Sequence, residues 1–153
     1  MAHAESSRNA VVDRSTGVGL DWELAFLARF AGPLLLLARA MLAYIFILEG
    51  SGKISSYAGV SGYMEQHGVP GALLPLVILT ELGGGLLVLF GLQTRWAAIA
   101  LGGFCLLTGL FFHLGADQAA QLQKNIAMAG GFLALATAGP GPWSIDGWRA
   151  RGR

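Results

Sequence analysis

The stretch Ala72-Leu-Leu-Pro-Leu-Val-Ile-Leu-Thr-Glu-Leu-Gly-Gly-Gly-Leu-Leu-Val-Leu-Phe-Gly-Leu92 places one carboxyl group, that of Glu81, near the middle of an otherwise apolar segment. A helix of about 20 residues crosses a hydrocarbon core about 30 Å thick. A charge at the centre of such a helix costs about 2.5–3.5 kcal/mol on insertion scales, and it usually faces a protein interior, a partner or a water-filled path. The stretch therefore predicts a membrane span and marks Glu81 as a candidate site residue.

The composition of the whole chain is that of an integral membrane protein. Of 153 residues, 54% are hydrophobic and 12% are charged, and the mean hydropathy is +0.59, whereas soluble domains carry about 25% charged residues. The apolar runs are continuous rather than alternating, which excludes the strands of a membrane β-barrel. The sequence predicts an all-α bundle of four transmembrane helices within residues 33–143, at about 33–51, 72–92, 96–114 and 122–138.

The positions of the basic residues predict the topology. Most arginines outside the spans fall on the side of the N-terminus, the second loop and the C-terminus; they are Arg8, Arg14, Arg29, Arg95, Arg149, Arg151 and Arg153. Basic residues concentrate on the cytoplasmic side of a membrane, so we expect a multi-pass protein with both termini in the cytoplasm. The net charge of +1 and the lack of a dense basic cluster argue against nucleic acid as a partner.

The segments outside the bundle are short. Residues 1–18 are small, polar and charged and are expected to form a mobile cytoplasmic tail. Residues 144–153 are expected to form a cytoplasmic C-terminal tail. Within residues 19–32, apolar side chains recur at helical spacing, with Trp22 as an interface anchor. This segment is predicted to be an amphipathic helix on the inner leaflet or an extension of the first span. A cleaved signal peptide is the alternative, but the apolar run begins late and is long.

Small residues are predicted to bring the helices together. Gly102, Cys105 and Gly109 lie on one stripe of the third span, and Ala127, Gly131 and Ala134 on one stripe of the fourth. Small residues allow helix backbones to approach closely in lipid. We therefore expect these two stripes to face the bundle interior.

One intramembrane polar pair is predicted from depth. Counted from the cytoplasmic ends of their spans at 1.5 Å per residue, Arg39 lies about 9 Å deep and Glu81 about 16 Å. A long arginine side chain bridges that offset, so the sequence predicts an ion pair between Arg39 and Glu81, direct or through water. Its role is either to fix helix register or to bind a polar head group or relay protons.

A second polar group is predicted at the external ends of the spans. Glu49 and Lys53 form an i, i+4 pair, and His113 ends the third span close to them. The predicted external-side cluster consists of Glu49, Lys53, His67, His113, Lys124 and Asn125. His67 and His113 are the candidate ligands of a haem or metal site, but no paired ligand spacing is present, so we expect no metal. His67 lies in a loop that either caps the bundle at headgroup depth or forms a lid over a cavity.

No motif identifies a reaction. Cys105 is the single cysteine, so the chain alone cannot perform dithiol exchange, and Gly83-Gly-Gly85 lies inside a span rather than in a nucleotide-binding loop. We therefore expect no catalysis by the chain on its own.

Several short motifs, in order along the chain, resemble those of the DoxX family of small bacterial membrane proteins. They are Arg39, Gly50-x-Gly-Lys53, Gly68-Val-Pro70, Glu81-Leu-Gly-Gly84, Gly91-Leu-Gln-Thr-Arg95 and Gly139-Pro-Gly-Pro-Trp-Ser-Ile-Asp146. The family often has a histidine just before the Gly-x-Gly-Lys turn, where this chain has Glu49.

The resemblance implies a four-helix protein of the bacterial inner membrane whose relatives are linked to thiosulfate and quinone oxidation or to oxidative-stress complexes. The resulting hypothesis is an accessory or quinone-proximal subunit of a membrane redox assembly, with quinone as the candidate ligand. Its partners would be the lipid bilayer and either other membrane subunits or further copies of the chain. The alternatives are a small-solute permease and a factor that assembles or stabilises other membrane proteins.

Overall fold

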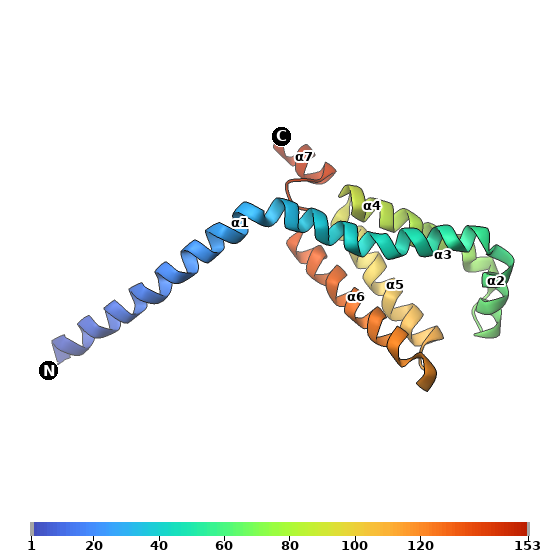
Figure 1. The fold of residues 1–153 in the computed structure, drawn as a ribbon, viewed down its shortest axis with the longest axis horizontal. Helices are drawn as coiled ribbons and strands as arrows, with labels where there is room; N and C mark the ends of the chain where they lie inside the picture. Colours follow the sequence, from blue (N-terminus) through green and yellow to red (C-terminus); the bar gives the residue numbers. More distant parts are fainter. Residues whose placement is uncertain (1, 153) are drawn as a thin grey trace.

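The computed structural model describes the backbone of residues 2–152 and the side chains of Trp22 and of residues 24–152. All regular structure in this part of the chain is helical, as predicted (Figure 1). The elements are α1 (Ala2–Ser55), α2 (Tyr57–Gln66), η1 (Gly71–Leu73), α3 (Leu74–Ile78), η2 (Leu79–Gly83), α4 (Gly84–Phe90), α5 (Thr94–Phe112), η3 (Ala116–Gln118), α6 (Ala119–Ala138) and α7 (Ile145–Arg151).

The first helix, α1, is continuous through Pro33 and changes direction partway along its length (Figure 1). Proline removes one backbone hydrogen bond and commonly bends a helix. Residues 19–32 thus continue into the first span, which is one of the two arrangements predicted for them. The predictions of a mobile tail at 1–18 and of an interfacial position for 19–32 stay predictions, because most of the side chains before residue 24 lie outside the described part.

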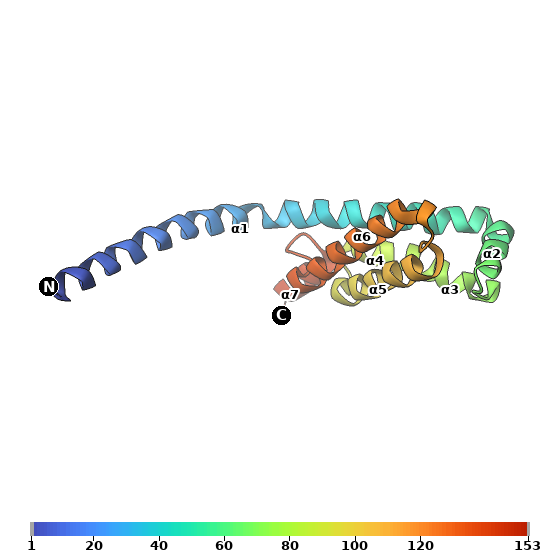
Figure 2. The same cartoon turned by 90° about the horizontal axis from the view of Figure 1, so that it is seen from below.

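The bundle consists of two helix pairs. Residues 71–90 form one helical rod of η1, α3, η2 and α4, and this rod runs alongside α1. α5 and α6 form the second and most closely packed pair. The two pairs are inclined to each other, and α2 turns across one end of the bundle (Figures 1 and 2). We call this the α2 end; the opposite end, next to α7, is the α7 end.

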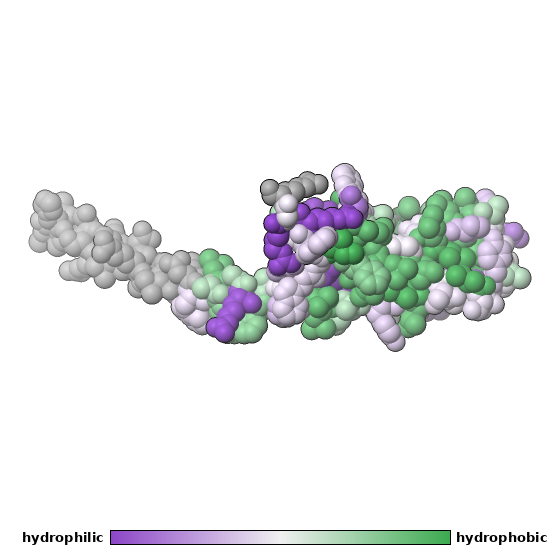
Figure 3. All heavy atoms as spheres, turned by 90° about the horizontal axis from the view of Figure 1, so that it is seen from above, coloured by the Kyte–Doolittle hydropathy of each residue, from purple (hydrophilic) through white to green (hydrophobic). Residues whose placement is uncertain are grey.

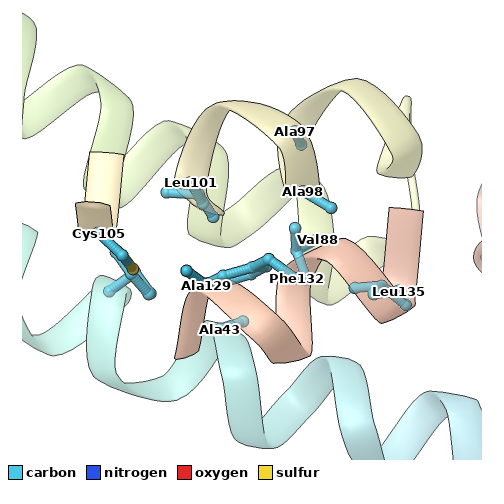
Figure 4. Close-up of a cluster of buried hydrophobic side chains, with 10 residues drawn as sticks. Ala43, Val88, Ala97, Ala98, Leu101, Cys105, Ala129, Phe132 and Leu135 are labelled. Atoms are coloured by element: carbon cyan, nitrogen blue, oxygen red, sulfur yellow. The ribbon is translucent and has the colours of Figure 1, made fainter. Parts of the chain in front are cut away.

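Phe132 of α6 lies at the centre of the packed core. Its side chain is fully buried and lies among Ala43 of α1, Val88 of α4 and Ala98 of α5 (Figure 4). The ring of Phe46 meets it edge-on, with 5.3 Å between the ring centroids. One large ring surrounded by small side chains joins all four helices at this level.

The small residues of α5 face this core as predicted, but two of the three on α6 do not. Gly102 and Gly109 are buried, and a Cβ on Gly102 would lie 3.3 Å from the Cβ of Phe132. On α6, Gly131 packs against Leu42 of α1, whereas Ala127 and Ala134 are exposed and the buried face consists of Asn125, Ala129, Phe132 and Leu135. The prediction was wrong for Ala127 and Ala134, because the large Phe132 fills the space left by small residues on its partners.

Three helical stretches in the described part are long and apolar enough to cross a membrane: Leu24–Ser55, Gly71–Phe90 and Thr94–Phe112. The fourth predicted span corresponds to α6, which is 20 residues long but begins with the polar segment Gln121–Asn125. Apolar residues cover much of the bundle surface, and hydrophilic residues gather beside α7 (Figure 3). A four-span arrangement therefore stays a proposal.

At the α7 end, two charged side chains form hydrogen bonds with backbone groups that are distant in the sequence. Arg39 is fully buried and donates to the carbonyl oxygens of Leu89 (3.3 Å) and Trp143. The Asp146 carboxylate accepts from the backbone N–H groups of Gln93 and Thr94, both at 3.1 Å, at the start of α5. A helix N-terminus has N–H groups without helical partners and favours negative charge, so Asp146 caps α5 from outside the helix.

Gly91 is required in this arrangement for two reasons. Its φ of +69° is left-handed and ends α4, and a Cβ at this position would clash with the Arg39 guanidinium and the Ser144 side chain. A glycine is the residue that meets both conditions.

Replacement of Asp146 with alanine should lower the free energy of unfolding by about 1–2 kcal/mol, since it removes the cap of α5. Thermal or denaturant unfolding in detergent micelles measures this loss. The matched control is Asp117→Ala, because the exposed Asp117 bonds only its neighbour Gln118 among the described side chains. Equal stability of the two variants would contradict the capping role.

Candidate functional site

A cavity of about 1250 Å³ occupies the α2 end of the bundle. Its walls come from α1, α2, the rod of residues 71–83, α5 and α6, and they are mainly apolar. Seven residues give it its charged and strongly polar groups: Glu49, Lys53, Glu81, His113, Gln121, Lys124 and Asn125. The structure thus gathers most of the predicted external-side cluster around one space, together with Glu81.

An ion pair between Lys53 and Glu81 lies in this wall. The Lys53 Nζ is 2.8 Å from Glu81 Oε2 and 3.0 Å from Oε1. The side chains are only 19% and 7% exposed, respectively. Opposite charges attract strongly where water is scarce, and each of these groups would be costly to bury alone. The pair therefore supplies a charged, directional hydrogen-bonding group inside an otherwise apolar cavity.

The local backbone brings these two groups together. Gly50, one turn before Lys53, lies directly against η2, and a Cβ on it would stand 2.8 Å from the backbone nitrogen of Leu82. Any larger residue at position 50 would push α1 away from Glu81. Glu81 itself lies in η2, a π-helical segment. Such segments are rare in proteins, but where they occur inside α-helices they are often at functional sites.

Glu49 extends the charged group toward the outside. Its Oε2 is 3.5 Å from Lys53 Nζ, and its side chain is 60% exposed. Lys53 thus lies between one buried and one exposed carboxylate. The three side chains form a continuous charged path from the cavity wall to the surface of the bundle.

His113 and Asn125 add further polar groups. Asn125 is 7% exposed, and the buried Nδ1 of His113 has no hydrogen-bond partner among the described residues. Both line the cavity. A buried polar atom without a partner is uncommon in proteins, and this one belongs to a side chain of the cavity wall.

His67 does not line the cavity. It is exposed, its Nδ1 lies 2.9 Å from the Tyr63 carbonyl oxygen, and its ring packs against that of Phe112. Tyr63 also stacks on Phe112, with centroids 5.7 Å apart. The loop predicted as a cap or a lid thus contains α2, whose Val60, Tyr63 and Met64 form one wall of the cavity.

The predicted pair of Arg39 and Glu81 is corrected by the structure. Arg39 bonds carbonyl oxygens at the α7 end, whereas Glu81 pairs with Lys53. The contact of Gly50 with Leu82 sets the register of α1, and Arg39 precedes Gly50 by 11 residues, a rise of about 16 Å along the helix. The prediction counted the depth of each residue from the end of its own span, so it did not include this displacement of α1 along the rod that carries Glu81. The Gly50-x-Gly-Lys53 motif, which lies within α1, was the sequence signal for Lys53 as the partner of Glu81.

Comparison with known proteins identifies the family of the chain. It matches the DoxX family over residues 34–114. It is 50% identical to "Inner membrane protein YqjF" of Escherichia coli over 114 residues, which are 72% of this chain and 88% of the relative. It is 32% identical to "Inner membrane protein YphA" of the same organism over 123 residues, with 74% and 88% covered. No solved structure matches it. The chain is a membrane protein that belongs to the DoxX family, as its motifs indicated.

Lys53→Met should lower the free energy of unfolding by about 3–5 kcal/mol, because it leaves the Glu81 carboxylate buried without its partner. Adding Glu81→Gln should restore most of this loss. The control, Glu49→Gln, removes the exposed carboxylate and should cost less than about 1 kcal/mol. Denaturant unfolding of the variants in detergent measures each value. If Lys53→Met costs no more than Glu49→Gln, the Lys53–Glu81 pair is not the buried contact described above.

Proposed function

We propose that this protein is a quinone-binding subunit of a redox assembly in the bacterial inner membrane, where it spans the bilayer four times with both termini in the cytoplasm. In that orientation the cavity opens in the outer half of the membrane. The observation that carries the proposal is the combination of a large apolar cavity with one buried ion pair in its wall. Sites for small ligands are typically apolar with a few polar groups that orient the ligand.

The chemistry of a quinone fits these groups. The Lys53 ammonium has three N–H donors, of which the contacts with Glu81 and Glu49 leave capacity for a ligand. It can donate to a quinone carbonyl oxygen, and the Glu81 carboxylate can accept from a quinol hydroxyl. His113 offers a further polar atom through its unpartnered Nδ1. The apolar walls suit the ring and its substituents.

The redox centre that exchanges electrons with the quinone belongs, in this proposal, to a partner subunit. Cys105 is the one cysteine of the chain, so the chain supplies no internal dithiol. Its contribution is to bind and orient the quinone beside that partner. This division of labour agrees with the role that the family resemblance implies.

Transport by a permease is the weaker alternative, because the cavity occupies only the α2 end. Toward the α7 end the space between the helices is filled by Phe132, Leu101 and Val88, all fully buried. A solute would therefore meet a packed core after entering. The size of the cavity likewise favours a ligand site over a purely structural assembly factor.

Purified protein should bind a decyl-substituted benzoquinone saturably, with one quinone per chain. The double variant Lys53→Met with Glu81→Gln should raise the Kd at least about tenfold, a loss of about 1.4 kcal/mol. It removes both charges at once, so neither is left buried alone. Isothermal titration calorimetry in detergent measures the Kd, and Glu65→Gln, on α2 but outside the cavity lining, is the control. Unchanged affinity of the double variant would contradict the proposal.

A further inference from the structure

Two sides of the cavity differ in chemistry. Between α1 and α6, its lining residues include Glu49, Gln121 and Lys124. Between the rod of residues 71–83 and α5, the lining residues are apolar, for example Leu76, Leu107 and Phe111, except for Thr80, Glu81 and Thr108. A lipid-soluble molecule would be excluded from the first side by the cost of desolvating charged groups, but not from the second.

The apolar side is open. Leu76 and Leu107 both line the cavity and are 60% and 55% exposed, so no neighbouring helix covers either side chain. Within the rod of residues 71–90, α5 contacts α4 and, to a lesser extent, η2, and the helix pairs diverge toward the α2 end (Figure 1). We call this opening between residues 73–80 and α5 the lateral window.

Gly103 keeps the lateral window free of side-chain atoms on the α5 side. It is exposed, it lines the cavity, and no atom lies within 4 Å of the place a Cβ would occupy. Gly103 therefore differs from Gly50, which must be small because the Leu82 backbone lies against it; no neighbouring backbone requires a glycine at position 103. Glycine weakens a helix relative to alanine. What the glycine provides at position 103 is open space beside the cavity, which a side chain would fill.

We propose that the ligand enters from the bilayer through the lateral window, and that its apolar tail stays in the window while its polar head reaches Lys53 and Glu81. The ligand is then a lipid-soluble molecule with one polar ring and a long chain, not a water-soluble quinone. This inference rests on the proposed function and specifies its substrate class and route of access.

The size of the cavity is consistent with such a ligand. Its volume of about 1250 Å³ exceeds the roughly 300–1,000 Å³ usual for small-molecule sites, and a single quinone ring fills only part of it. The remaining volume continues along the apolar lining toward the window. A head group at the ion pair and a tail in the window together account for both parts of the cavity.

The test compares Gly103→Trp with Gly130→Trp. Gly130 is also an exposed helical glycine with no atom within 4 Å of a Cβ position, but it lies on α6 outside the cavity lining. Each variant is titrated with decyl-benzoquinone and with the tail-less parent benzoquinone in detergent. We expect Gly103→Trp to raise the Kd for the decyl compound roughly tenfold or more and to leave the Kd for the tail-less compound within about twofold. Gly130→Trp should change neither.

Each other result has one meaning. Wild-type protein that binds neither compound overturns the proposed function itself. Wild-type protein that binds the decyl compound, together with Gly103→Trp protein that binds it equally well, overturns the lateral window alone. Equal loss of both compounds in Gly103→Trp also overturns the window, because the tail would then have no separate site. If that variant does not fold, Ala100→Trp, one turn earlier on the same exposed cavity wall, replaces it in the same comparison.

Discussion

The ion pair between Lys53 and Glu81 is the constraint on which the rest of the structure depends. Two charges in an apolar bundle are tolerated only when they meet, and here they meet at 2.8 Å. That distance requires α1 to approach the second helical rod closely, which Gly50 allows. The π-helical segment η2 carries the carboxylate at the same level. The cavity lies beside this contact at the α2 end, where the pair of α1 and the rod diverges from the pair of α5 and α6 (Figure 1).

The α7 end of the bundle is closely packed and hydrogen-bonded. Arg39 and Asp146 satisfy backbone groups of the loops and of the first turn of α5, and Phe132 fills the space between the four helices. The packed half of the bundle, at the α7 end, is its scaffold, and the half at the α2 end contains the cavity. On α1, the buried Arg39 therefore belongs to the packed scaffold, and the partly buried Lys53 lines the cavity.

The sequence predicted the helical class of the fold from its composition, and it singled out most of the charged residues that line the cavity from charges in or beside apolar runs. Glu81 stands out in its span, and Glu49, Lys53, His113, Lys124 and Asn125 fall at helix ends that a bundle brings together. The pairing of Glu81 was missed because it depends on how far α1 slides along its neighbour. Contacts such as Gly50 with Leu82 set that register, and a single sequence does not report it. The fourth helix was similarly misjudged on its packing face, where Phe132 replaces the expected small residues.

The most direct test of the account is mild-detergent purification of the chain from native membranes, followed by native mass spectrometry of what remains bound. The account predicts the chain together with one lipid-soluble quinone and at least one redox subunit. The variant without the Lys53 and Glu81 charges should keep the subunit and lose the quinone. A chain recovered alone, without quinone or partner, or a quinone retained equally by that variant, would contradict it.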